Sequence, residues 1–220
     1  MRQPGSAIKP VTYATALRKG YTAAHLLMDT PTTFPVISQP DYKPINYDGN
    51  FHGPLQIRYA LGNSINVPAV KMLAQVGLKE VLTTAEQVGI STLAPTTQNL
   101  RRLGLSVTLG GGEVRLLEMT AAYATFANGG LRAEPVSILK VTDKDGKILD
   151  EYKPVSGKSA LTPQQAFLIS DILADNNARL ITFGEHSALV IPGRTVAAKT
   201  GTTNDKRDNW TIGWTPQIVV

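Results

Sequence analysis

The spacing of apolar residues predicts a largely helical chain. Apolar positions recur every three to four residues, as on one face of a helix, in the segments 11–17, 55–61, 68–76, 78–88, 114–127 and 163–174. Gly20 and Gly89 follow two of these segments, where glycine commonly ends a helix. Thr162 precedes the last segment, and we expect its side chain to cap that helix.

Strand patterns occur in two other places. Residues 136–152 are expected to form a hairpin, because Asp145 and Gly146 make a typical turn between two alternating runs. Residues 195–199 and 209–214 are expected to be two further strands. Helices in one part and strands in another indicate a fold of the α/β class, of the α+β type.

Two long segments, 29–54 and 90–112, show no sustained period and predict irregular loops. Loops of this length in a compact domain are often functional. The chain has 220 residues, 42% of them hydrophobic and 18% charged, which is enough for one domain with a buried core. We therefore expect a single domain over residues 1–220.

Charge and composition exclude several classes of function. The net charge is +5, but the basic residues are scattered and form no stripe with aromatic residues, so we predict no nucleic-acid partner. There are no cysteines, which excludes disulfides, thiolate metal sites and a cysteine nucleophile. The three histidines show no ligand spacing, so no metal and no cofactor is predicted. No apolar run is long enough to span a bilayer, which takes about 18 residues or more.

The first candidate for chemistry is the pair Ser6 and Lys9. Residues three apart share one face of a helix, so the hydroxyl and the amine can approach each other. A serine needs an adjacent base to become a nucleophile, and a lysine can be that base where burial or nearby positive charge keeps it neutral. The alternative is an ordinary solvated helix face, because this spacing is common by chance.

The second candidate is Ser64-Ile65-Asn66, between two helical segments. A serine hydroxyl and an asparagine amide on one side of a turn can relay a proton and hold a substrate peptide group. The alternative is structural, with Asn63 or Ser64 capping the helix that follows.

The third candidate is the segment from Lys199 to Thr203, at the end of a predicted strand. Gly201 lets a substrate backbone come close, and a lysine with two threonine hydroxyls suits a carboxylate. The alternative is a plain strand end with a turn glycine.

Together these segments match a motif set, S-x-x-K, S-x-N and K-T-G, found in penicillin-binding proteins and serine β-lactamases. The flanking residues extend the match. The chain resembles class A, high-molecular-weight penicillin-binding proteins in RQPGSAIKP at 2–10, ALGNSINVPAV at 60–70, EMTAAYATFANGG at 118–130 and KTGTTND at 199–205. The resemblance covers nearly the whole chain.

The resemblance implies the fold of penicillin-binding proteins and serine β-lactamases, an antiparallel sheet joined to a helical subdomain with the site between them. Compared with that family, residues 1–220 are expected to be a partial transpeptidase domain, incomplete at both termini. The implied reaction is D,D-transpeptidation. Ser6 attacks the D-Ala-D-Ala bond of a peptidoglycan stem and releases D-Ala, and an amine of a second stem takes the acyl group.

The same resemblance assigns roles to the catalytic candidates. Lys9 is the base for Ser6, Ser64 carries a proton to the leaving amine, and Lys199 supplies positive potential.

It also assigns the substrate-binding candidates. Asn66 binds the peptide amide of the donor, while Thr200, Gly201 and Thr202 hold its terminal carboxylate end. The backbone amides of Ser6 and Thr202 form the oxyanion hole.

The implied partners are peptidoglycan stem peptides and β-lactams, which acylate Ser6 as substrate mimics. The implied location is the extracytoplasmic face of the bacterial cytoplasmic membrane, reached through an N-terminal anchor that lies outside this sequence. Two alternatives stay open. One is a hydrolase of the D,D-carboxypeptidase or β-lactamase kind, although no glutamate resembles the deacylating residue of class A β-lactamases. The other is an inactive or sensor-type module that binds the same ligands.

Overall fold

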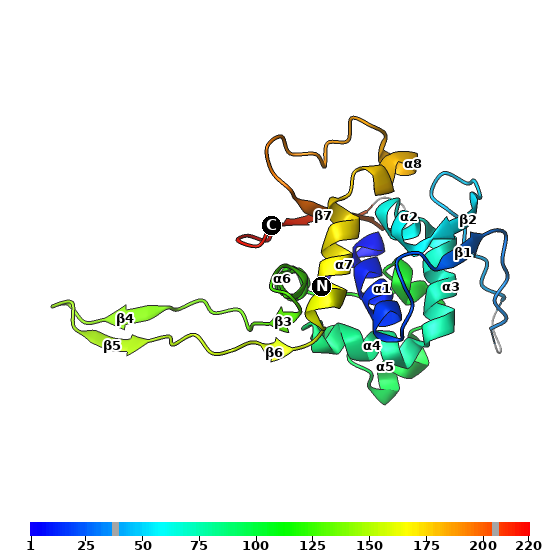
Figure 1. Ribbon diagram of the computed structural model, residues 1–220. Coiled ribbons are helices and arrows are strands. Elements are labelled where there is room, and N and C mark those ends of the chain that lie inside the picture. The colour runs from blue at the N-terminus through cyan, green and yellow to red at the C-terminus, as the bar shows by residue number, and fades with distance from the viewer. Residues whose placement is uncertain (37–39, 204–206) are drawn as a thin grey trace.

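Helix α1 (Lys9–Arg18) is the centre of the molecule. The computed structural model in Figure 1 describes residues 1–36, 40–203 and 207–220. Every residue of α1 except Arg18 is buried, and a 3₁₀ turn, Gly5–Ile8, leads into it. A helix buried on all sides has no polar face, so its threonines need partners within the core. Thr12 pairs with Thr108 and Thr15 with Thr84.

Four longer helices and three short ones are described around α1 (Figure 1). They are α2 (Ile57–Gly62), α3 (Asn66–Val76), α4 (Leu78–Gln87), α5 (Thr97–Arg102), α6 (Leu116–Ala127), α7 (Pro163–Ala174) and α8 (Leu180–Phe183). Further 3₁₀ turns lie at Ser91–Leu93, Leu105–Leu109 and Asn177–Arg179. Thr162 caps α7 and forms a capping box with Gln165, as the sequence predicts.

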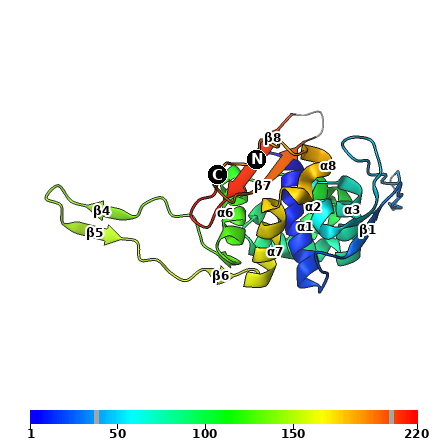
Figure 2. The same ribbon diagram turned by 45° about the horizontal axis from the view of Figure 1, so that its top comes forward.

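The described strands form antiparallel pairs. Strand β7 (Ala197–Thr202) pairs along its whole length with β8 (Asn209–Trp214), from Ala197 opposite Trp214 to Thr202 opposite Asn209. Figure 2 shows this pair along one side of the helical body, beside α7. The other pairs are β1 (Leu26–Asp29) with β2 (Gly53–Gln56), β3 (Leu131–Arg132) with β6 (Lys158–Ser159), and β4 (Lys140–Thr142) with β5 (Ile148–Glu151).

Strands β4 and β5 form a long arm that projects from the body (Figure 1). All residues of both strands are exposed, including the apolar Val141, Ile148 and Leu149. The hairpin expected over residues 136–152 is therefore present, with shorter strands than the sequence pattern covers.

The two segments expected to be irregular loops contain short regular elements, so that prediction was wrong in detail. Segment 29–54 contains the start of β2, and segment 90–112 contains α5. Strand β2 spans four residues and α5 spans six, which is too short for a period to show in the sequence. Strand β2 owes its form to pairing with β1, whereas α5 is fixed locally, because the Thr96 side chain accepts from the Asn99 backbone amide at its start.

Candidate active site

Ser6 sits in the 3₁₀ turn that enters α1, half buried between buried neighbours. This turn packs directly against β7. A Cβ on Gly201 would lie 2.3 Å from the Pro4 carbonyl oxygen, and one on Gly5 would lie 2.5 Å from that of Thr202. Glycine at both positions thus lets two backbones touch beside the serine, which brings the first and third motifs together.

The Lys9 side chain is fully buried and reaches the second motif. Its Nζ donates to the carbonyl oxygens of Ser64 and Ile65, the latter at 3.2 Å, and to Asn66 Oδ1 at 2.7 Å. The described part of the chain offers no hydrogen-bond partner to the Ser6 hydroxyl, so the bond to Lys9 that the spacing allows is not formed here.

Lys199 approaches the same serine from β7. Its Nζ donates to Ser64 Oγ at 2.7 Å and to the Thr200 carbonyl at 2.8 Å. The Lys9 amine is 3.4 Å from the same Ser64 Oγ, so one hydroxyl lies between two buried amines. Ser64 has a φ of 59°, the one positive value among the described non-glycine residues, and such strain is typical of functional sites.

Burial lowers the pKa of both lysines. Burial first, and then the positive charge of Lys199, hold the pKa of Lys9 well below the usual value. Burial and then the Arg179 guanidinium lower the pKa of Lys199 to about 7. Arg179 is itself 2% exposed, and one guanidinium nitrogen donates to the Leu173 carbonyl. Lys9 therefore releases its proton more readily than an exposed lysine does.

The structural alternative for the second motif was wrong. Asn63 and Ser64 do not cap α3, because the Asn63 side chain bonds to Tyr59, Ala178 and Thr182 instead. The cap comes from a distant residue. Asn46 Oδ1 accepts from the backbone amides of Asn66 and Val67 at 3.0 and 3.1 Å.

The remaining predicted residues lie on β7. Thr200 and Thr202 are half buried on β7, and Gly201 is buried between them. The sequence motifs thus fold onto a shared region made by the 3₁₀ turn, the start of α3 and β7.

Comparison with known proteins gives the family. The family model of the penicillin binding protein transpeptidase domain matches residues 1–219. This chain belongs to the penicillin-binding protein transpeptidase family. A penicillin-binding protein 1A from Aquifex aeolicus is 37% identical over 220 residues, and one from Neisseria meningitidis is 34% identical over 227 residues. Each alignment takes in 100% of this chain but only 28% and 27% of those relatives' lengths.

Solved structures confirm the fold of this chain. Penicillin-binding protein 1A from Haemophilus influenzae aligns with a TM-score of 0.82 and 26% identity, over 96% of this chain and 36% of that one. The PonA1 protein from Mycobacterium tuberculosis in complex with penicillin V aligns with a TM-score of 0.79 and 25% identity, over 97% of this chain and 57% of that one. The expected mixed fold of helices and antiparallel strands is therefore confirmed.

The sequence analysis missed several residues of the candidate site. Asn46 lies in the long polar segment 29–54 and Arg179 lies in a short 3₁₀ turn, and neither belongs to a motif. Tyr123 is fully buried and donates to the Ala7 carbonyl at 2.7 Å, which ties α6 to the serine turn. Tyr123 falls within a segment that resembles the family, and that was its one signal.

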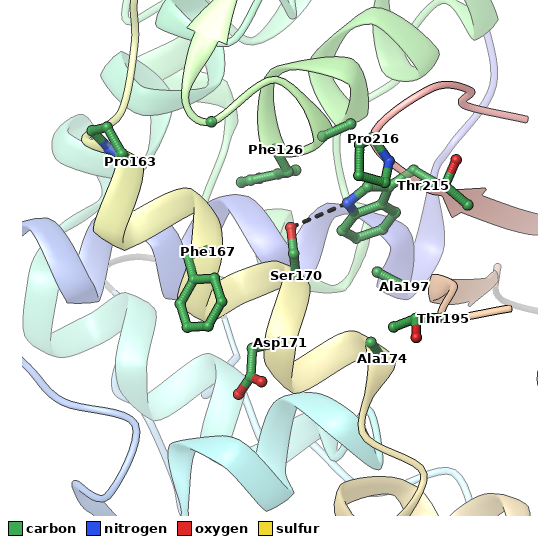
Figure 3. A pocket seen from close by; sticks show the side chains of 13 residues that line it. Phe126, Pro163, Phe167, Ser170, Asp171, Ala174, Thr195, Ala197, Thr215 and Pro216 are labelled. Atoms are coloured by element: carbon green, nitrogen blue, oxygen red, sulfur yellow. Dashed lines mark hydrogen bonds between the residues drawn. The ribbon is translucent and has the colours of Figure 1, made fainter.

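A hollow elsewhere on the molecule is separate from the site around Ser6 and Ser64. Figure 3 shows it between α6, α7 and the ends of β7 and β8, with Phe126, Phe167 and Pro216 on its walls. Trp214 donates to Ser170 there at 3.1 Å. Its lining includes none of the motif side chains among the described residues. Among the described residues, no helix is long and apolar enough to cross a membrane.

Proposed function

We propose that this chain is a peptidoglycan D,D-transpeptidase whose nucleophile is Ser6. The observation that carries the proposal is the Ser64 hydroxyl held between the buried amines of Lys9 and Lys199, next to the serine turn. This arrangement gives one amine for taking a proton, one for positive charge and a hydroxyl between them. Family membership and the intact motif set support the same conclusion.

In the acylation step, neutral Lys9 takes the proton of Ser6, and Ser6 Oγ attacks the carbonyl carbon of the D-Ala-D-Ala bond. The ammonium so formed finds acceptors in place, the carbonyls of Ser64 and Ile65 and the amide oxygen of Asn66. The oxyanion is stabilised by the backbone amides of Ser6 and Thr202. The close packing of Gly5 against Thr202 supports that pairing.

Collapse of this intermediate needs a proton on the leaving nitrogen. Ser64 supplies it and recovers a proton from Lys9, so that D-Ala departs as a free amine and Ser6 stays acylated. The amine of a second stem peptide then attacks the ester carbonyl, and the same groups carry its proton in the reverse direction. Water in place of the amine gives hydrolysis.

Substrate binding uses residues at the start of α3 and along β7. Asn66 Nδ2 donates one hydrogen to the Ile45 carbonyl at 2.9 Å, which leaves its second hydrogen for a donor peptide carbonyl. The charge of Lys199 and the hydroxyls of Thr200 and Thr202 bind the terminal carboxylate. Gly201 lets the donor backbone lie against β7.

We further propose that β-lactams acylate Ser6 in place of the stem peptide. A solved relative supports this, since the PonA1 protein from Mycobacterium tuberculosis has been solved in complex with penicillin V. Because peptidoglycan stem peptides are the substrate, we place the activity on the extracytoplasmic face of the cytoplasmic membrane. We also propose that residues 1–220 work as one domain.

A product analysis tests the proposal. The chain is incubated with a stem pentapeptide ending in D-Ala-D-Ala, with and without a second stem carrying a free amine, and Ser6→Ala is the control. We expect D-Ala release to require Ser6, and a cross-linked dimer to form only when Ser6 and the amine are both present. Continued release of D-Ala with the amine present but without any dimer indicates a carboxypeptidase. Release of one D-Ala per chain, with the acyl group kept on Ser6 and no dimer formed, indicates a binding module. Either result contradicts the proposal.

A further inference from the structure

Outside the motifs, a set of buried polar contacts begins at Asp29, the last residue of β1. Its side chain is 0% exposed. Both carboxylate oxygens accept from Asn46 Nδ2, at 2.9 and 2.8 Å. Oδ2 also accepts from the His52 backbone amide at 2.9 Å and from His52 Nδ1 at 2.8 Å. A buried carboxylate is tolerated only with such partners, so this residue is held in one position.

Asn46 connects this carboxylate to the second motif. It is 3% exposed, and its Nδ2 also donates to the Asn50 carbonyl at 2.7 Å. A carboxylate oxygen accepts and does not donate, so Asp29 fixes which end of the Asn46 amide faces it. The Asn46 oxygen must then point at α3, where it accepts from the backbone amides of Asn66 and Val67.

The contacts converge on Asn66 and through it on Lys9. Ile45, the neighbour of Asn46, accepts from Asn66 Nδ2 at 2.9 Å. Asn46 therefore binds the backbone amide of Asn66, and Ile45 binds its side chain. With Nδ2 bound to Ile45, Asn66 Oδ1 is turned to Lys9 Nζ at 2.7 Å.

We infer that Asp29 and Asn46 are positioning residues of the transpeptidase, which set the side chain of Asn66 and so the amine of Lys9. Neither residue touches Ser6 or Lys9 in the described contacts, so they act through Asn66. This inference rests on the proposed function, because it gives these residues a part in acylation. A displacement of about 1 Å at a catalytic group lowers a rate by roughly a hundredfold.

An exchange of the two side chains tests the inference. In Asn46→Asp two buried carboxylates face each other and the Asp29 contact breaks. In the double variant Asp29→Asn with Asn46→Asp the donor and acceptor change places, so the pair forms again. Asn50→Asp is the matched control, because it makes the same change on the same segment at an exposed side chain.

The readout is the acylation rate constant for a fluorescent penicillin, measured beside a thermal melt. We expect Asn46→Asp to acylate roughly ten- to a hundredfold more slowly, the double variant to recover most of that loss, and Asn50→Asp to match the parent chain. Acylation of Asn46→Asp at the parent rate, or a double variant no faster than the single one, would overturn the inference.

The side-chain amide signals of Asn66 give a second readout that does not need acylation. Assigned in a ¹⁵N–¹H spectrum with Asn66→Ala, they are expected to shift in Asn46→Asp and to return in the double variant. If the parent chain is not acylated but these signals move and return, the proposed function fails while the positioning role stands. If the signals stay in place in Asn46→Asp, the positioning role fails.

Discussion

At the scale of the residue, the site depends on two buried lysines that share one serine hydroxyl. Burial and then the positive charge of Lys199 lower the pKa of Lys9. Burial and then the Arg179 guanidinium lower the pKa of Lys199. Two cations this close do not both keep their protons easily. We infer that Lys9 loses its proton first, which gives a neutral base next to a charged partner.

This order predicts a bell-shaped dependence of acylation on pH. The rate rises with pH as Lys9 becomes neutral, since a lowered pKa places its neutral form within the working range. The rate falls again near pH 7, because the pKa of Lys199 is about 7 and its charge is lost above that value. The measurement is the acylation rate constant for a fluorescent penicillin between pH 5 and pH 10.

Lys199→Arg separates the two limbs of this profile. A guanidinium stays charged throughout that range, so the variant is expected to lose the alkaline limb and to keep the acid limb, at a lower absolute rate. An alkaline limb that persists unchanged in Lys199→Arg would show that Lys199 does not govern it.

The sequence was sufficient for the residues that belong to motifs, and insufficient for those that support them. Ser6, Lys9, Ser64 and Lys199 were predicted from the motif set and the family resemblance that it carries. The structure brings the side chains of Lys9, Ser64 and Lys199 together, with the turn that holds Ser6 packed against β7. Asn46 belongs to no pattern, because its role depends on a fold that places it at the start of α3. Long-range contacts of this kind leave no local periodicity.

At the scale of the element, the site requires that β7 lie directly on the 3₁₀ turn of Ser6. Gly201→Ala tests this, because a Cβ there would meet the backbone of Pro4 at 2.3 Å and that of Ala7 at 2.8 Å. We expect the free energy of unfolding in urea to fall by about 1–3 kcal/mol, as for other overpacked sites. We also expect acylation to slow at least about tenfold, because the strand moves away from Ser6.

Gly213→Ala on the neighbouring strand is the matched control. Its new Cβ would lie 3.5 Å from Val196 and 3.7 Å from the Ala197 carbonyl, which are ordinary contacts. We expect its unfolding free energy and its acylation rate to match those of the parent chain. Equal behaviour of the two alanine variants would argue against the close contact between β7 and the serine turn.

The longer helices were predictable from the sequence, whereas the short strands depend on tertiary pairing. Helices such as α6 and α7 bury apolar residues over several turns, so their period is visible in the sequence. Strand β1 shows alternate burial over only four residues. It pairs with β2, where Gly53, the partner of Asp29, lies 24 positions further along the chain. This pairing is therefore fixed by tertiary contacts.

At the scale of the whole molecule, the projecting arm of β4 and β5 is separate from the core and from the site. Its strands pair with each other, and their residues are exposed. Replacing residues 136–155 by a short glycine–serine linker is expected to change the free energy of unfolding by less than about 1 kcal/mol, since loop closure depends weakly on length. The acylation rate is expected to stay that of the parent chain.

A larger loss of stability, measured by urea unfolding, would mean that the arm packs on the body. A slower acylation in a fully folded variant would mean that the arm contributes to the site. Both results would contradict the separation seen in the structure.

The central claim is that Ser6 is an activated nucleophile in an assembled site. Intact mass of the chain after incubation with benzylpenicillin tests it most directly, with Ser6→Ala beside it and a cooperative melt for both proteins. We predict a stoichiometric adduct of one penicillin per chain, absent from Ser6→Ala. A folded chain that forms no adduct, or an adduct that persists in Ser6→Ala, would contradict the claim.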